Sequence, residues 1–134
     1  MGMHAANRLI SIVDDDPLLR EGLISLLRSA GFATQAFASA EEFLSLARRD
    51  DIGCLILDVR SPGISGLELQ SQLTATVSNH RTPVVFMTAR DDEATRQRAL
   101  KGGAVDFLRK PVRREALLNA VHLALQQNDG KTRG

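Results

Sequence analysis

Residues 53–68 read GCLILDVRSPGISGLE, and the order of features in this stretch decides the fold class. A short apolar run from Cys54 to Leu57 predicts a strand that is buried on both faces, and this run ends in Asp58. Ser65 and Glu68 follow with the spacing of a capping box, which predicts the start of a helix. A buried strand that leads through a loop into a helix is typical of a parallel sheet covered by helices.

The same alternation of a short apolar run with a longer amphipathic run occurs five times along the chain. Repeated alternation of this kind is the pattern of a parallel sheet with helices on both faces, so we predict a single doubly wound α/β domain. The predicted strands are Leu9 to Val13, Ala33 to Phe37, Cys54 to Leu57, Pro83 to Met87 and Val105 to Leu108.

Helix start signals lie between the predicted strands. Asp16 precedes Pro17, which is a good cap followed by a proline in the first turn, and Ser39 with Glu42 has the spacing of a second capping box. The residues predicted to face the core are Leu19, Leu23, Leu26, Leu27 and Ala30 in the first helix, Phe43, Leu44 and Ala47 in the second, Leu69, Leu73 and Val77 in the third, and Leu117, Leu118, Val121 and Leu125 in a last helix from about Val112 to Gln126.

The fourth helix, predicted from Asp91 to Lys101, differs from the others. It offers mainly Ala94, Ala99 and Leu100 to the core, and most of its other residues are charged or polar. We expect its packing to be the weakest of the five helices. This favours a movable or partner-facing element, and a simply solvated surface helix is the alternative.

The chain has 134 residues, which is enough for one domain with its own core. Its 17 Lys and Arg residues nearly balance its 16 Asp and Glu residues, so bulk charge gives no reason to expect a nucleic-acid or membrane partner. No apolar run approaches the roughly 18 residues that a membrane-spanning helix needs. We therefore expect a cytoplasmic protein without direct nucleic-acid binding, in which the single cysteine, Cys54, is buried and unreactive.

Acidic, hydroxyl and ammonium side chains follow the predicted strands. Asp14, Asp15 and Asp16 come after the first strand, Asp58 after the third, Thr88 after the fourth and Lys110 after the fifth. Ligands of doubly wound sheets bind beyond the carboxyl ends of the strands, so we expect these side chains to converge on one edge. Carboxylates about 4 Å apart repel one another by several kcal/mol per pair, and a divalent cation removes this penalty. Mg²⁺ prefers oxygen ligands and suits such a pocket.

Asp58 is the natural nucleophile of this group, because an aspartate that faces a metal ion can attack a phosphoryl group and form an acyl phosphate. Asp14 and Asp15 are then better placed to hold the metal. Lys110 would neutralise phosphoryl oxygens, and the Thr88 hydroxyl would donate a hydrogen bond to one of them. Three adjacent aspartates taken alone more often form a solvated turn or a helix cap, so the prediction depends on the whole set.

Taken together, these residues resemble the response-regulator receiver family. The resemblance is carried by V-D-D at 13–15, L-I-L-D at 55–58, D-x-x-x-P-x-x-x-G at 58–66, M-T-A at 87–89 and G-A-V-D-F-L-R-K-P at 103–111. It covers residues 8–126, which leaves an N-terminal extension at 1–7 and a polar tail or the start of a linker at 127–134. The stretch GFATQAFASAEEFL at 31–44 is most similar to receivers of the FixJ type.

The resemblance implies a flavodoxin-like fold with the strand order 2-1-3-4-5 and five helices on the two faces of the sheet. It implies that Asp58 is the phosphorylation site and that Mg²⁺ (or Mn²⁺) binds beside it. The implied metal ligands are Asp15 directly, Asp14 mainly through water, Asp58 itself and the backbone carbonyl of Arg60.

By the same resemblance, Thr88 is the switch hydroxyl, Phe107 the rotating aromatic and Lys110 the phosphate-binding lysine, with a cis peptide bond between Lys110 and Pro111. The implied activity is signalling and not turnover of an external substrate. A sensor histidine kinase supplies the phosphoryl group, which switches the face formed by the fourth helix, the fifth strand and the fifth helix. A phosphorylation-dependent homodimer through this face is also implied. The family usually has methionine where this chain has Ser61, and we expect little effect on the chemistry.

Four other interpretations fit parts of the pattern. A haloacid-dehalogenase-like phosphohydrolase needs a second aspartate two residues after the nucleophile, where this chain has Arg60. A dinucleotide-binding domain needs G-x-G-x-x-G after the first strand, and an EF-hand loop from Asp14 needs glycine where Leu19 stands. A receiver fold that has lost phosphorylation is disfavoured, because the chain has all five residues that the chemistry needs: Asp14, Asp15, Asp58, Thr88 and Lys110. Both a fragment of a DNA-binding regulator and a stand-alone receiver remain open.

Overall fold

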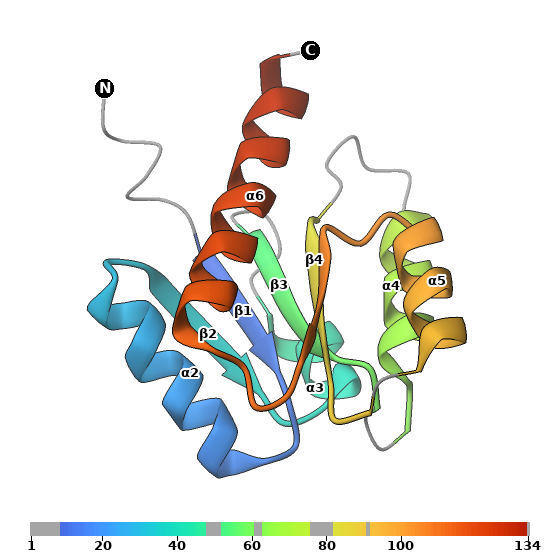
Figure 1. The fold of residues 1–134 in the computed structure, drawn as a ribbon, viewed down its shortest axis with the longest axis horizontal. Coiled ribbons are helices and arrows are strands. Elements are labelled where there is room, and N and C mark those ends of the chain that lie inside the picture. Colours follow the sequence, from blue (N-terminus) through green and yellow to red (C-terminus); the bar gives the residue numbers. More distant parts are fainter. Residues whose placement is uncertain (1–8, 48–51, 61–62, 76–81, 91, 134) are drawn as a thin grey trace.

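A five-stranded parallel sheet forms the centre of the molecule, in the order β2-β1-β3-β4-β5 (Figure 1). The computed structural model describes residues 9–47, 52–60, 63–75, 82–90 and 92–133. The strands are β1 (Leu9–Val13), β2 (Ala33–Phe37), β3 (Ile52–Asp58), β4 (Val84–Thr88) and β5 (Asp106–Arg109). All four neighbouring pairs are parallel, so the predicted doubly wound sheet and its strand order are confirmed.

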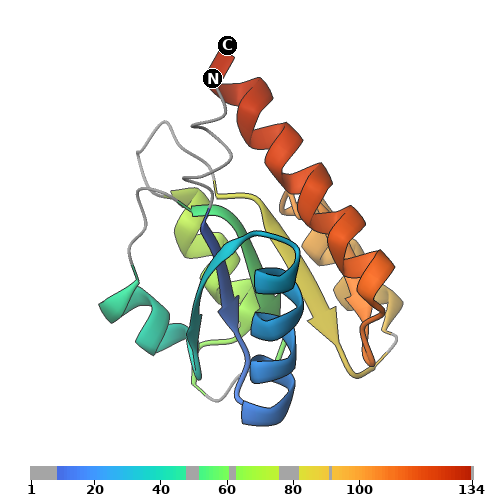
Figure 2. The ribbon, with the colours of Figure 1, turned by 90° about the vertical axis from the view of Figure 1, so that its left-hand side faces the viewer.

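Five helices within the described residues cover the two faces of the sheet. They are α2 (Pro17–Ser29), α3 (Ala40–Leu46), α4 (Gly66–Ala75), α5 (Glu93–Lys101) and α6 (Arg114–Arg133). The helices α2 and α6 lie on one face, and α3, α4 and α5 lie on the other (Figures 1 and 2). Because successive side chains of a strand point to opposite faces, β3 sends Cys54 and Ile56 toward α2 and α6, and Leu55 and Leu57 toward the other helices.

The predicted helix starts and the buried cysteine are also found in the structure. The Asp16 carboxylate accepts the first backbone N–H groups of α2, and the Ser39 hydroxyl accepts the N–H of Glu42 in α3. Before α4, Ser65 and Glu68 each accept the other's backbone N–H, which completes the predicted capping box. Burial raises the pKa of the Cys54 thiol to about 12, so this thiol stays protonated near neutral pH.

Several element boundaries differ slightly from the prediction. β3 begins two residues earlier than predicted, and β4 and β5 each lie one residue later along the chain. α5 begins at Glu93, two residues later than predicted, because the Asp92 carboxylate accepts the N–H groups of the first turn and caps the helix. In α4, Leu69 is buried and Leu73 half-buried as predicted, and Val77 lies outside the described residues.

The last helix is longer than predicted. The sequence predicts it from about Val112 to Gln126, whereas α6 begins at Arg114 and continues to Arg133. The backbone of residues 127–133, predicted as a frayed tail or the start of a linker, is therefore helical. An established helix gains a further backbone hydrogen bond for each residue added, so polar residues can extend it without burying apolar side chains. None of the helices in the described ranges is long and apolar enough to cross a membrane.

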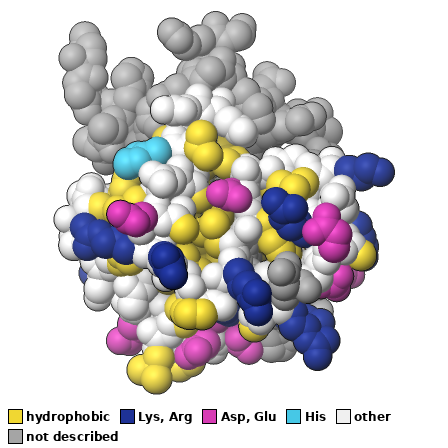
Figure 3. Space-filling model, viewed as in Figure 1, with side chains coloured by type: hydrophobic (Ala, Val, Ile, Leu, Met, Phe, Trp, Pro, Cys, Tyr) yellow, Lys and Arg dark blue, Asp and Glu magenta, His cyan; other side chains and the backbone are white. Residues whose placement is uncertain are grey.

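The helix α5 buries Ala99, whereas Ala94 and Leu100, which were also predicted to face the core, are exposed. Charged side chains of both signs gather on the side of the molecule where α5 lies (Figure 3). A polar contact adds to this packing, because the Gln70 amide of α4 donates a 3.0 Å hydrogen bond to the Ala99 carbonyl. Gly102 leaves room for this amide, since a Cβ atom there would lie 2.7 Å from Gln70 Oε1.

Candidate functional site

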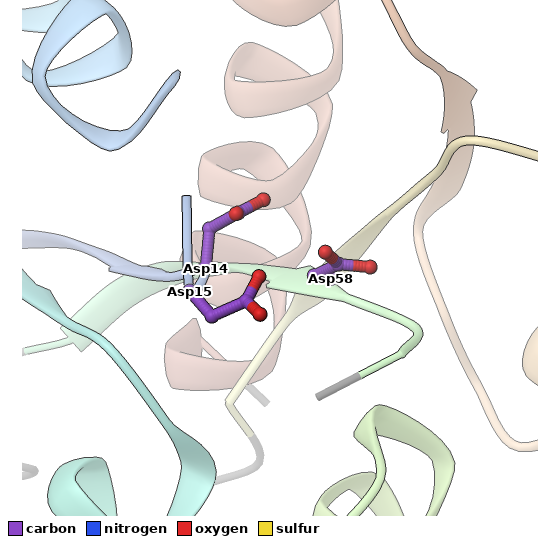
Figure 4. Close-up of side chains that lie close together, drawn as sticks. All are labelled: Asp14, Asp15 and Asp58. Carbon is purple, nitrogen blue, oxygen red and sulfur yellow. The ribbon is translucent and has the colours of Figure 1, made fainter. Parts of the chain in front are cut away.

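Three carboxylates meet at the carboxyl ends of β1 and β3. Asp14 and Asp15 directly follow β1, and Asp58 is the last residue of the neighbouring β3. One oxygen of each carboxylate lies within 4.8 Å of an oxygen of the other two (Figure 4). Asp16, which is also predicted at this edge, uses its carboxylate to cap α2. The structure thus brings together three of the four predicted aspartates, because parallel strands end at the same edge of the sheet.

Lys110 joins this group from the end of β5. Its Nζ atom donates hydrogen bonds to Asp14 Oδ2 at 2.8 Å and to Asp58 Oδ2 at 2.9 Å. Burial alone would lower the pKa of Lys110, but the hydrogen bonds to the two carboxylates outweigh it and raise this pKa above its usual value. Lys110 is therefore a firmly charged ammonium group that holds the ends of β1 and β3 together. The predicted cis peptide bond between Lys110 and Pro111 is present.

Asp58 is a buried carboxylate with a hydrogen bond to each of its two oxygens. The residue is 6% exposed, and its Oδ1 atom accepts the Arg60 backbone N–H at 3.0 Å. Burial raises the pKa of Asp58 above its usual value, and the nearby charge of Asp14 acts in the same direction. The hydrogen bonds from Lys110 and from the Arg60 N–H oppose this rise. Asp58 therefore carries a negative charge that its surroundings only partly compensate.

Close contacts around position 66 explain why the D-x-x-x-P-x-x-x-G motif ends in glycine. A Cβ atom at Gly66 would lie 2.5 Å from the Asp58 carbonyl oxygen and 3.1 Å from a ring carbon of Phe86. The Gly66 N–H also donates a 2.9 Å hydrogen bond to the Val59 carbonyl. Glycine thus allows α4 to begin directly against the end of the strand that carries Asp58.

Asp14 is held from several directions. It is fully buried, its Oδ1 atom accepts the Asp16 N–H at 2.8 Å, and its own N–H donates to the Phe37 carbonyl at 3.1 Å. Arg20 of α2 donates a 2.7 Å hydrogen bond to the Asp14 carbonyl, a contact that sequence reasoning missed. A sequence signal existed, because a cation in the first turns of a helix is unfavourable near the positive end of the helix dipole and suggests a specific partner.

Thr88 and Phe107 lie at the predicted strand positions. Thr88 ends β4 and is 5% exposed, and its hydroxyl donates to the Arg90 carbonyl at 2.8 Å and accepts the Arg90 N–H at 3.1 Å. Phe107 of β5 is half-buried and packs against Phe86, with 6.3 Å between the ring centroids. The Thr88 hydroxyl thus donates its proton to the Arg90 carbonyl, and this bond must break before the hydroxyl can donate to a ligand at Asp58.

The donor set fits a hard divalent cation. Three carboxylates and one ammonium group leave a formal net charge of −2 in the pocket when all are ionised. Like charges at this spacing repel by about 4 kcal/mol per pair at 4 Å and an effective dielectric constant of 20, which Lys110 relieves only in part. Carboxylate oxygens are the ligands that Mg²⁺ and Mn²⁺ prefer. The acidic cluster is typical of the magnesium site of receiver domains.

Comparison with known proteins identifies the family. The family model described as "Response regulator receiver domain" matches residues 10–122. The chain belongs to this family. It is therefore a receiver domain of the two-component signalling type and not a conventional enzyme, and its acidic pocket is formed by Asp14, Asp15 and Asp58 with Lys110.

Individual relatives support the predicted similarity to FixJ-type receivers. Nodulation protein W of Bradyrhizobium diazoefficiens is 44% identical over 125 residues, which cover 93% of this chain and 54% of the relative. Transcriptional regulatory protein FixJ of Azorhizobium caulinodans is 41% identical over 116 residues, covering 87% of this chain and 54% of the relative. The solved structure of the response regulator StyR is 48% identical, with a TM-score of 0.84 over 94% of this chain and 63% of that one. The receiver chain spans about half the length of the curated relatives it matches.

Proposed function

We propose that this receiver domain accepts a phosphoryl group on the carboxylate of Asp58 from a phosphohistidine of a sensor histidine kinase. The observation that carries the proposal is the shared position of Lys110, whose ammonium group lies within hydrogen-bond distance of both Asp14 and Asp58. A cation held between a buried nucleophile and a second carboxylate can follow the developing charge of a phosphoryl group without a large rearrangement.

The transfer is a displacement at phosphorus. One Asp58 oxygen attacks the phosphorus atom, the new O–P bond forms as the P–N bond to the donor imidazole breaks, and the imidazole keeps the electron pair of that bond. The Arg60 N–H holds Oδ1 of Asp58, which orients the carboxylate. Lys110 donates to Oδ2 in the unphosphorylated state and is placed to donate to phosphoryl oxygens after transfer.

Asp14, Asp15 and Asp58 would hold the magnesium ion, or manganese in its place, with the Arg60 backbone carbonyl as a further oxygen ligand. When bound, the ion neutralises charge on the phosphoryl oxygens. The chain itself supplies the ordering of the ligands. Asp14 is fixed by the Arg20 hydrogen bond to its carbonyl, and Asp58 by the Arg60 N–H.

The proposed switch uses Thr88 and Phe107. Charge-assisted hydrogen bonds from Thr88 and Lys110 to phosphoryl oxygens contribute roughly 1.5 to 3 kcal/mol each. Moving a two-state element from 1:99 to 99:1 takes about 5.5 kcal/mol, so two such contacts supply much of it. Thr88 gives up its bond to the Arg90 carbonyl in exchange, which lowers its net contribution. The surface formed by α5, β5 and α6 is the part expected to respond, including by forming a phosphorylation-dependent homodimer.

The output is part of the same proposal. The relative from Azorhizobium caulinodans is named a transcriptional regulatory protein, and the receiver chain spans about half of it. We therefore expect a role in the control of transcription that involves no direct nucleic-acid binding by these 134 residues. A cytoplasmic location belongs to the same proposal.

Mass spectrometry of the intact protein after incubation with acetyl phosphate and Mg²⁺ tests the phosphorylation. The wild-type chain should gain one phosphoryl group, and Asp58→Asn should gain none. Asp16→Asn is the matched control, because it also removes one carboxylate charge near the pocket but only from the α2 cap, and it should be phosphorylated like the wild type. A phosphoryl group found on the Asp58→Asn variant would refute the proposed site.

A further inference from the structure

The described residues between β3 and α4, 59–60 and 63–65, are held at both ends close to Asp58. At its start, the Val59 N–H donates to the Met87 carbonyl at 3.0 Å, and the Arg60 N–H donates to Asp58 Oδ1 at 3.0 Å. At its end, the Gly66 N–H donates to the Val59 carbonyl at 2.9 Å. A displacement of Gly66 would therefore act on Val59, which lies between Asp58 and the Arg60 N–H that orients its carboxylate.

A side chain from another element holds this loop close to its end. Glu41, in the first turn of α3, accepts the Ile64 N–H on its Oε2 atom at 3.0 Å, although the two residues are 23 positions apart. Gly63 beside it has a φ of +78°, and a Cβ atom there would collide with the Glu41 carboxylate. The backbone at residues 63–64 thus accommodates the Glu41 carboxylate, because Gly63 has no Cβ atom to collide with it and the Ile64 N–H donates a hydrogen bond to it.

We propose that Glu41 is a positioning residue for phosphorylation, which fixes the β3–α4 loop so that Asp58 and the Arg60 carbonyl are aligned for Mg²⁺ and for the phosphoryl group. This inference rests on the proposed function and adds a residue of α3 to it. Glu41 touches neither the acidic cluster nor Lys110 among the described contacts, so it acts through the loop. Glu41 would thus not bind the metal ion itself, but would orient the groups that bind it.

A purely local role for Glu41 is the competing explanation. An acidic residue in the first turn of a helix is stabilising whatever else it contacts, because it lies near the positive end of the helix dipole. Glu42 provides the matched control, since it is also acidic, lies in the same turn and accepts a backbone N–H, that of Ala38, at 2.9 Å. Glu41→Ala and Glu42→Ala therefore each remove one negative charge and one side-chain acceptor of a backbone N–H, but only the first removes the contact with the loop.

Mg²⁺ affinity of the unphosphorylated protein is the decisive measurement, followed by backbone amide NMR during titration with MgCl₂. Glu41→Ala should weaken Mg²⁺ binding by about 3- to 10-fold, below the roughly 10- to 100-fold typical of metal outer-shell residues because this carboxylate is solvent-exposed. Glu42→Ala should bind Mg²⁺ like the wild type. Glu41→Gln keeps an acceptor for the Ile64 N–H and should recover most of the affinity, which a role of the charge alone would not allow. Equal Mg²⁺ affinity in Glu41→Ala and Glu42→Ala, or no recovery in Glu41→Gln, would overturn the proposal.

The rate of phosphorylation by acetyl phosphate separates this inference from the proposed function. If the wild type is phosphorylated on Asp58 and Glu41→Ala reacts about 3- to 10-fold more slowly than Glu42→Ala, both stand. If the wild type is phosphorylated and the two variants react equally, the role of Glu41 is wrong while the proposed function stands. If the wild type is not phosphorylated at all, the proposed function fails, and the Mg²⁺ titration still decides whether Glu41 orders the site.

Discussion

Both faces of the sheet pack through apolar clusters, but the helices that cover them differ in length and in their polar contacts. On one face, the long helices α2 and α6 pack through an apolar cluster that includes the fully buried Leu27 and Val121. On the other face, α3, α4 and α5 are shorter, and α5 buries Ala99. Polar contacts between elements supplement the packing there, among them the Gln70 amide on the Ala99 carbonyl and the Glu41 carboxylate on the β3–α4 loop.

This difference distinguishes two parts of the molecule. We call the core between α2, α6 and the sheet the frame, and we expect the face covered by α3, α4 and α5 to rearrange more easily. Exposing buried apolar side chains to water has a high free-energy cost. A single hydrogen bond contributes only about 1 kcal/mol to stability and can be exchanged for another. The residues expected to switch belong to the second face or border it, since Phe107 packs there against Phe86 and Thr88 leads into the loop before α5. We infer that the apolar core between α2, α6 and the sheet holds the site in place, while α5 and β5 respond to it together with the exposed side of α6.

The largest effect on stability is expected for a substitution in the apolar core of the frame. Leu27→Ala removes a fully buried side chain between α2 and the sheet and should lower the free energy of unfolding by about 2–5 kcal/mol. Urea unfolding followed by circular dichroism measures this change. Leu46→Ala is the control, because Leu46 is 67% exposed at the end of α3 and its truncation should change stability by less than about 0.5 kcal/mol. Similar losses in the two variants would contradict the contrast between frame and surface.

A smaller and more local effect is expected for Gln70→Ala. The change removes the hydrogen bond from α4 to the Ala99 carbonyl, and Ala99 keeps a second donor in the Ala104 N–H, so the loss should be about 1 kcal/mol. Hydrogen exchange should accelerate more in α5 than in α2 and α6, where it should rise only as far as the loss of global stability requires. Gln97→Ala removes a hydrogen bond within α5, to Glu93, and serves as the control.

The two glutamine variants distinguish attachment of α5 from its internal stability. Gln97→Ala should fray α5 slightly, with a cost of about 0.2–0.5 kcal/mol, and leave its contact with α4 intact. If Gln70→Ala and Gln97→Ala change exchange in α5 equally, the tie between the two helices has no special role. If Gln70→Ala accelerates exchange to the same extent in α5, α2 and α6, α5 unfolds together with the frame and the division into two faces is wrong.

Much of the fold and the centre of the site could be predicted because they follow from strand pattern and topology. Apolar runs mark strands, and parallel strands with helical crossovers bring all their carboxyl ends to one edge. Asp14, Asp58 and Lys110 could therefore be grouped without knowledge of any contact, although Lys110 lies 96 positions from Asp14 in the chain. The helical extension at residues 127–133 was missed, because polar residues there carry no apolar stripe to mark a helix.

The residues that order the site could not be predicted in the same way. Glu41, Gln70 and Arg20 each bind a backbone group of another element, and backbone N–H and carbonyl groups occur at almost every position. A sequence therefore gives no sign of which one a side chain will meet. The engagement of the Thr88 hydroxyl by Arg90 has the same origin, since its partner is the main chain of the next loop.

The smallest effect, and the one that tests the electrostatics of the site, is the pH dependence of Asp58→Asn. Burial raises the pKa of Asp58 above its usual 3.8, so the folded state binds this proton more tightly than the unfolded chain does. The ionised form of Asp58 thus lowers the free energy of unfolding at all pH values above the pKa that Asp58 has in the folded state. This loss of stability disappears as the pH falls below 3.8. The hydrogen bonds from Lys110 and the Arg60 N–H oppose the shift, so the net effect is small.

Asp58→Asn should accordingly be more stable than the wild type near pH 7, and this advantage should vanish toward about pH 3. Asp92→Asn should behave in the opposite way, because hydrogen bonds from Thr95 and from the first turn of α5 lower the pKa of the Asp92 carboxyl. The ionised form of Asp92 stabilises the fold above the usual pKa, and this contribution is lost as the pH falls through the lowered value. Urea unfolding of both variants from about pH 7 to about pH 3 would show opposite signs, since one carboxylate is buried among like charges and the other caps a helix. If Asp58→Asn were instead less stable than the wild type near pH 7, as Asp92→Asn should be, Lys110 would fully compensate Asp58, and the pocket would need no divalent cation for its charge balance.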